Sequence, residues 1–273
     1  MRKARNSDKN GKYNYLFADQ QSQKRRKEAG AQRHKIKGDL ERKVKEKLLQ
    51  TWSPEQVSGY LKIEDNVYIS APTIYKYVKS GRVPMSCLRH SGKKYKPSKK
   101  IVSVKFIPNR VDISERPKIV EEKSRVGDWE GDLVISHHSH CALLALVDRA
   151  SKHVIIEKIE DKTMQSTNAA IIKALKNQPI HTITFDNESE FAGHEIVANA
   201  LKAKIYFVRP YKSCERGFNE HTNGLIRQFL PKKFDFKNVT NHEIKIIEDY
   251  LNNRPRKVLE YKKPLEICQS LVV

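Results

Sequence analysis

Long apolar runs are missing from this 273-residue sequence. The longest uninterrupted one covers 142–147, preceded by Cys141, and a membrane-spanning helix needs ~20 apolar residues. The basic stretch 1–10 leads into no apolar segment, so it lacks the central part of a secretory signal. We therefore expect no membrane partner and a cytoplasmic location.

Cysteine is scarce as well, and its four positions are far apart, with no paired spacing: Cys87, Cys141, Cys214 and Cys268. This spacing argues against a disulfide framework and against a structural zinc site. Three histidines, at 137, 138 and 140, precede Cys141, but zinc ligands typically come as two separated pairs. We interpret that cluster as a hairpin loop.

Acidic residues are outnumbered, 32 against 53 Lys and Arg, which leaves a formal charge of +21. Residues 1–125 carry 32 basic and 13 acidic residues, whereas 126–273 carry 21 and 19. A basic region of this size favours a polyanionic partner, because each cation that neutralises a phosphate releases a counterion. We predict a flexible basic tail over 1–38 and a basic linker over 83–125. The tail either contacts such a partner or is only solvated.

A small helical module is predicted for residues 39–82. Ser53 is a helix N-cap followed by Pro54 at the first helical position, and Ser70 is a second cap. The helix after Ser70 has one apolar face and ends at Gly81. This pattern is typical of a helix-turn-helix, whose second helix enters the major groove of DNA, although an ordinary three-helix packing unit would look similar. The outward residues of that helix are the predicted DNA contacts: Thr73, Lys76 and Lys79.

Residues 126–273 change to short apolar segments that alternate with helical ones. We predict strands at 128–135, 140–148, 153–159, 181–186 and 205–208, with helices at 164–176, 195–201 and 217–230. Three successive strands joined by short turns, followed by alternating helices and strands, indicate an α/β fold with a mixed sheet. Ligands of such sheets bind at the carboxyl ends of strands.

Acidic residues stand at suggestive places in this part. Alternation puts Asp128, Glu130 and Asp132 on one face of the first strand, Asp186 ends a later strand, and Glu220 is on the polar stripe of the last of these helices. Carboxylates that converge on a cleft suit a pair of Mg²⁺ ions, although charges also protect edge strands and a helix-surface acid is usually only solvated. Basic residues around the last helix are predicted phosphate contacts, unless they too are merely solvated: Arg209, Lys212, Arg216, Arg227, Lys232 and Lys233.

Three motifs then carry a family resemblance. The motifs are WEGD at 129–132, FDN at 185–187 and NEHTNG at 219–224. There are 53 residues between Asp132 and Asp186, and 33 between Asp186 and Glu220. They resemble the DDE catalytic core of bacterial transposases and integrases. More narrowly, PYKSCERGFNEHTNGLIRQF and YLNNRPRKVLEYKKPLE are similar to the insertion sequence 30 family of transposases, and WSPEQVSGYL and ISAPTIYKYV resemble its second helix-turn-helix.

The resemblance implies an RNase H-like integrase core after the helix-turn-helix module. It implies that Asp132, Asp186 and Glu220 are both the catalytic residues and the ligands of two Mg²⁺ or Mn²⁺ ions, with Asp128 and Glu130 as neighbours. The implied function is that of a DDE transposase, which cuts at the ends of an insertion element and joins them to target DNA. Its partners are then double-stranded DNA, as inverted repeats and target, and further copies of the chain assembled on that DNA.

The sequence departs from the family pattern in three places. No helix-turn-helix can be placed before Asp39, so the chain looks truncated at its N-terminus, while Glu188 and Glu260 each stand where the family usually has glycine. A truncated, catalytically weak or inactive chain that only binds DNA is therefore the alternative to a transposase. A metal-dependent nuclease without strand transfer would share the three acids but would not need the helix-turn-helix.

Overall fold

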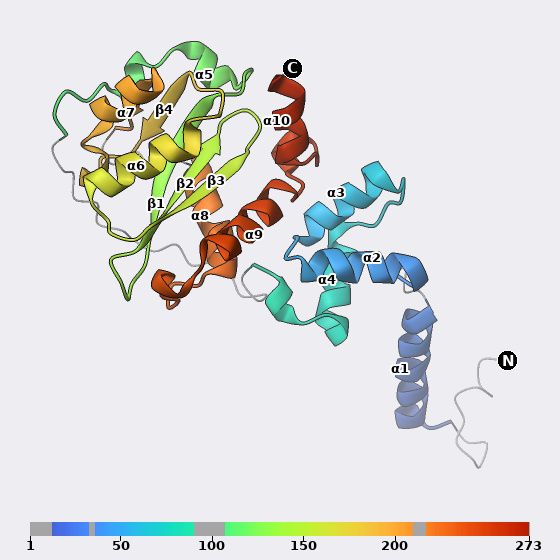
Figure 1. The fold of residues 1–273 in the computed structure, drawn as a ribbon. Helices are drawn as coiled ribbons and strands as arrows, with labels where there is room; N and C mark the ends of the chain where they lie inside the picture. The colour runs from blue at the N-terminus through green and yellow to red at the C-terminus, as the bar shows by residue number, and fades with distance from the viewer. Residues whose placement is uncertain (1–12, 33–35, 90–106, 210–216, 273) are drawn as a thin grey trace. The chain divides into compact units, whose positions relative to one another are not determined.

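The computed structural model describes residues 13–32, 36–89, 107–209 and 217–272 (Figure 1). The chain divides into two compact units, Met1–Lys47 and Leu48–Val273. The predicted boundaries at 38, 82 and 125 remain a prediction. No helix of the described residues is long and apolar enough to cross a membrane.

The first unit contains helix α1 (Tyr15–Gln32) and most of α2 (Gly38–Leu49). The sequence predicted no helix before residue 39, because α1 has no apolar stripe to mark it. Its residues are mostly Gln, Lys, Arg, Ala and Glu, which favour helix without any pattern. Helix α2 has Asp39 and Glu41 in its first turn and Lys47 in its last, the arrangement that its dipole favours.

The second unit begins with the predicted helix-turn-helix pair, α3 (Pro54–Glu64) and α4 (Ala71–Tyr77), which pack against each other. Ser53 caps α3 in a capping box with Gln56, as predicted from the cap and proline signals. The apolar face predicted for α4 and the following turn is buried, at Ile74, Tyr77 and Val78. Gly81 has φ 81° and ends this segment, as expected for a glycine stop.

A five-stranded mixed sheet follows, in the order β3-β2-β1-β4-β5. Its strands are β1 (Asp128–Ile135), β2 (Ala142–Asp148), β3 (Val154–Ile159), β4 (Thr182–Phe185) and β5 (Lys204–Phe207). The first three strands pair antiparallel, and β4 pairs parallel with both β1 and β5. The predicted α/β class, the mixed sheet and the order of its strands and helices are confirmed.

Helices cover both faces of the sheet (Figure 1). Helices α6 (Met164–Leu175) and α7 (His194–Leu201) share a core with Leu144 and Leu146 of β2, whereas α8 (Gly217–Phe229) and α9 (Asn241–Asn252) pack on the opposite side, with Leu143. Alternate residues of β2 thus serve two cores. The remaining short elements are η2 (Val78–Arg82), η3 (Met85–Cys87), η4 (Ile113–Glu115), α5 (Lys118–Glu122), η5 (Ser189–Phe191), η7 (Phe236–Asn238), η8 (Lys257–Leu259) and α10 (Pro264–Val272).

Candidate active site

Three carboxylates meet beside the middle of the sheet. Oxygen atoms of Asp132, Asp186 and Glu188 all lie within 4.8 Å of one another. Strands β1 and β4 run parallel with Glu130 opposite Thr184, and each of the two aspartates follows two residues later, so both side chains project from the same face. The structure therefore brings together Asp132 and Asp186, two of the three acids that the motifs singled out. Among the described residues this is the only group of His, Cys, Asp or Glu with the spacing of a metal site.

Glu188 was not predicted as a member of this group. Its backbone has φ −79° and ψ 142°, an extended conformation that any residue adopts, so the glycine of the family pattern is not needed for conformational freedom here. Its N–H donates to Oδ1 of Asp186 at 3.2 Å, and its own Oε2 is buried without a hydrogen-bond partner. Burial, followed by the negative charges of Asp186 and Asp132, raises the pKa of Glu188 to about 8. The sequence signal was only an acid two residues after a candidate ligand, and nothing in it told whether that side chain pointed inward.

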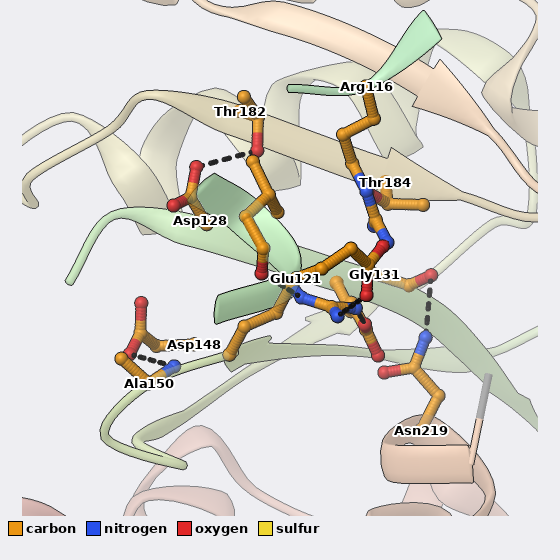
Figure 2. Close-up of polar contacts among 12 residues, drawn as sticks. Arg116, Glu121, Asp128, Gly131, Asp148, Ala150, Thr182, Thr184 and Asn219 are labelled. Atoms are coloured by element: carbon orange, nitrogen blue, oxygen red, sulfur yellow. Dashed lines mark hydrogen bonds and ion pairs between the residues drawn. The ribbon is translucent and has the colours of Figure 1, made fainter. Parts of the chain in front are cut away.

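Glu220, the third predicted acid, is exposed in the first turn of α8 and does not belong to this cluster. The same helix is nevertheless fastened to the site. Asn223, one turn further on, donates to Oδ2 of Asp132 at 2.7 Å, and residues three apart on a helix are neighbours. Asn219 donates to the carbonyl of Gly131 at 3.3 Å, as Figure 2 shows. Glu220 therefore lies in the first turn of the helix whose next turn contacts Asp132.

Gly131 lies between Glu130 and Asp132 of β1, at a position that has no room for a side chain. A Cβ on it would lie 2.4 Å from the ring of Phe185, which stacks on Phe191 with 4.3 Å between ring centroids. This close approach explains the glycine of the WEGD motif in physical terms.

The other two acids of β1 are engaged elsewhere. Asp128 accepts from Arg125 at 2.8 and 3.1 Å and from Thr182 at 2.8 Å (Figure 2). Glu130 is buried and paired with Arg149. Burial is the largest influence on Glu130 and raises its pKa, against the opposing effect of that guanidinium. Both carboxylates thus belong to ion pairs outside the three-acid cluster.

The predicted DNA contacts differ in their surroundings. Thr73 is half-buried, with its hydroxyl 2.9 Å from that of Ser70. Arg227 donates to the carbonyl of Ile135 at 2.5 Å and lies over the Phe236 ring at 5.1 Å, so it fastens α8 to its neighbours instead of projecting into solvent. The exposed ones are Lys76, Lys79, Arg209, Lys232 and Lys233. Lys212 and Arg216 lie outside the described residues.

Comparison with known proteins gives a family. The model of the integrase core domain matches residues 124–213. The transposase for insertion sequence element IS4351 of Bacteroides fragilis is 41% identical over 276 residues, a span of 98% of this chain and 84% of the relative. The chain belongs to the insertion sequence 30 family of transposases. The Escherichia coli transposase InsI of element IS30A is 36% identical over 250 residues, 84% of this chain and 64% of the relative. The transposase for IS1086 of Cupriavidus metallidurans is 33% identical over 243 residues, 84% of this chain and 72% of the relative.

As a member of the insertion sequence 30 family, the chain is a DDE-type transposase with an RNase H-like integrase core, as predicted. Membership favours transposition over both the catalytically silent DNA-binding chain and the nuclease without strand transfer. The integrase core implies use of divalent metal ions, and the three-acid cluster lies inside the matched segment. Glu220 follows the end of that segment.

Proposed function

We propose that Asp132, Asp186 and Glu220 are the catalytic carboxylates of this transposase and hold two Mg²⁺ or Mn²⁺ ions. The reaction is cleavage at the ends of an insertion element, followed by joining of the freed 3′ hydroxyl to target DNA. The observation that carries the proposal is the meeting of Asp132 and Asp186 on one sheet face within an integrase core.

The residues present fit a hard divalent cation. The cluster offers carboxylate oxygens within 4.8 Å of one another, and the buried Oε2 of Glu188 has no hydrogen-bond partner that would compete for it. Glu188 is thus a further ligand that this chain adds to the two aspartates. Bound divalent ions would supply activation of the attacking hydroxyl and stabilisation of the leaving oxygen.

The protein's own part is to hold these oxygens in place. Asp132 accepts the N–H of Leu133 on Oδ1 at 2.9 Å and the amide of Asn223 on Oδ2. The turn after Asp186 is held by Asn187, whose amide donates to the carbonyl of Val208 at 2.8 Å and whose carbonyl accepts from Arg110. Glu220 lies one turn before Asn223 on α8, and this proximity supports its assignment as the third carboxylate.

Double-stranded DNA is the substrate, as element ends and as target. Exposed lysines support contacts with the DNA backbone: Lys76 on α4, Lys79 on η2, and Lys232 and Lys233 after α8. We infer that further copies of the chain assemble on the DNA and that the reaction takes place in the cytoplasm.

The test is Mn²⁺-dependent joining of precut element ends to a target plasmid. Glu220→Gln should abolish joining while leaving the melting temperature near that of wild type, because an exposed side chain is changed. Glu195→Gln on α7 is the matched control and should join at the wild-type rate. Joining by Glu220→Gln at the wild-type rate would remove Glu220 from the catalytic set.

A further inference from the structure

A second site is suggested by a strongly basic cavity of about 990 Å³ in the unit Leu48–Val273. Seven Lys and Arg residues line it against two Glu. His221 also lines it and adds little charge, because burial and the nearby Arg256, Arg89 and Arg254 lower its pKa to about 4. Such an excess of cations is costly unless an anion binds among them.

Arg256 carries the strongest evidence. It is only 6% exposed, its Nη2 donates to the carbonyl of Leu251 at 3.1 Å, and its Nε and Nη1 are buried with no hydrogen-bond partner. Arg149, which lines the same cavity, is fully engaged with Glu130, Glu121 and the carbonyl of Val120. An arginine that lines a cavity and has two unsatisfied N–H donors points to a ligand with acceptor oxygens.

The cavity lies along the same sheet face as the three-acid cluster. Arg116, another lining residue, donates to Oγ1 of Thr184 at 2.9 Å (Figure 2). Thr184 comes two residues before Asp186 on that face, a distance of ~7 Å along an extended chain. Helix α8 links the two places, since Thr222 lines the cavity and Asn223 binds Asp132.

We propose that this cavity binds a backbone phosphate of DNA next to the reacting phosphodiester, with Arg256 as the charge-assisted donor. Nε and Nη1 of Arg256 each offer a charge-assisted hydrogen bond to a phosphate oxygen. DNA is a better fit than a free phosphate because Gln56 of α3, in the helix-turn-helix pair, and residues of the catalytic core line the same cavity. The assignment of the neighbouring phosphodiester rests on the proposed function, whereas the phosphate site itself does not.

Binding of random duplex DNA to the full chain in EDTA tests this, since no metal chemistry is involved. In Arg256→Gln the slope of log K against log salt should fall in magnitude by about 1, and affinity at low salt should fall about tenfold. Arg256→Lys keeps the positive charge but loses the planar guanidinium, so its DNA affinity should lie between those of wild type and Arg256→Gln. Lys176→Gln removes an exposed charge at the end of α6 and should bind like wild type. A folded Arg256→Gln with the wild-type slope would overturn the proposal.

Two further arms keep the test decisive. If circular dichroism shows that Arg256→Gln does not fold, Lys257→Gln takes its place, because Lys257 lines the cavity from an exposed position and should also reduce the slope. An unchanged slope in Lys257→Gln would then contradict the proposal.

In the other arm, inorganic phosphate replaces chloride at equal ionic strength. One outcome is that phosphate raises the melting temperature of wild type while Arg256→Gln binds DNA like wild type. This outcome would show that the cavity binds free phosphate and would refute its assignment to DNA.

Discussion

The side-chain amide of Asn223 donates a 2.7 Å hydrogen bond to Oδ2 of Asp132, which joins α8 to the middle of β1. The other oxygen of Asp132 accepts the N–H of Leu133, so the carboxylate is held from both sides. A ligand that is fixed before the metal arrives loses little freedom on binding it. Asn223 is therefore a positioning residue for the proposed metal site.

Asn223→Ala should weaken Mn²⁺ binding by about tenfold, because loss of a partner that orients a ligand typically costs 10–100-fold in metal affinity. The melting temperature in EDTA reports any purely structural effect. Asn253→Ala, which removes a hydrogen bond to the carbonyl of Asp249 at the end of α9, is the control and should bind Mn²⁺ like wild type. Calorimetric titration measures both, and unchanged Mn²⁺ affinity in Asn223→Ala would rule out the positioning role.

Asp186→Asn should stabilise the metal-free protein, since one of three crowded carboxylates loses its charge. The repulsion is expressed in the raised pKa of Glu188, to which Asp186 contributes. Two charges 4.8 Å apart interact by about 3–4 kcal/mol at an effective dielectric constant near 20, which sets the scale of the expected gain. Urea unfolding in EDTA at pH 8 checks it, with Asp161→Asn, an exposed acid, as the control. A lower free energy of unfolding for Asp186→Asn would show that the carboxylates do not repel one another.

Glu188→Gln should lower Mn²⁺ affinity by about tenfold while the fold persists, because a neutral amide replaces a carboxylate whose Oε2 is free to bind a cation. Glu188→Gly should do the same, since the extended backbone at this position does not require a particular residue. Glu195→Gln, exposed on α7, controls for loss of negative charge. Equal Mn²⁺ affinity in all four proteins would place Glu188 outside the metal site.

Glu260→Gly should raise the free energy of unfolding by about 0.5–1 kcal/mol. Glu260 has φ 55° and ψ 34°, in the left-handed region, which costs a residue with a Cβ about 1–2 kcal/mol, partly offset by the extra freedom of glycine when unfolded. Lys262→Gly nearby lacks a positive φ to relieve and should lower stability instead. Denaturant unfolding of the two variants separates the outcomes, and a loss of stability in Glu260→Gly would contradict the strain argument.

Much of the fold follows from local patterns in the sequence. A cap signal predicted Ser53, because a side-chain oxygen that satisfies an N–H of the first turn is a local interaction. Alternation and short turns predicted the strands of the sheet. Helix α1 was missed because helix-forming residues without an apolar stripe leave no periodic signal.

The site was only partly predictable, for a different reason. Asp186 was found because it ends a strand of a mixed sheet, where ligands bind, whereas only the family resemblance singled out Asp132 from Asp128 and Glu130. The inward orientation of Glu188 depends on a turn whose conformation no pattern specifies. Likewise, Arg256 has unsatisfied N–H donors because of the groups from distant segments that surround it. Neither composition nor spacing predicts those surroundings.

The central claim is that the acids on β1 and after β4 hold divalent metal. Calorimetric titration of Mn²⁺ into the wild-type chain and into Asp186→Asn, both shown to be folded by circular dichroism, tests it most directly. Wild type should bind Mn²⁺ saturably, and the affinity of the variant should be at least tenfold lower. Equal binding by the two proteins would show that Asp186 is not a metal ligand.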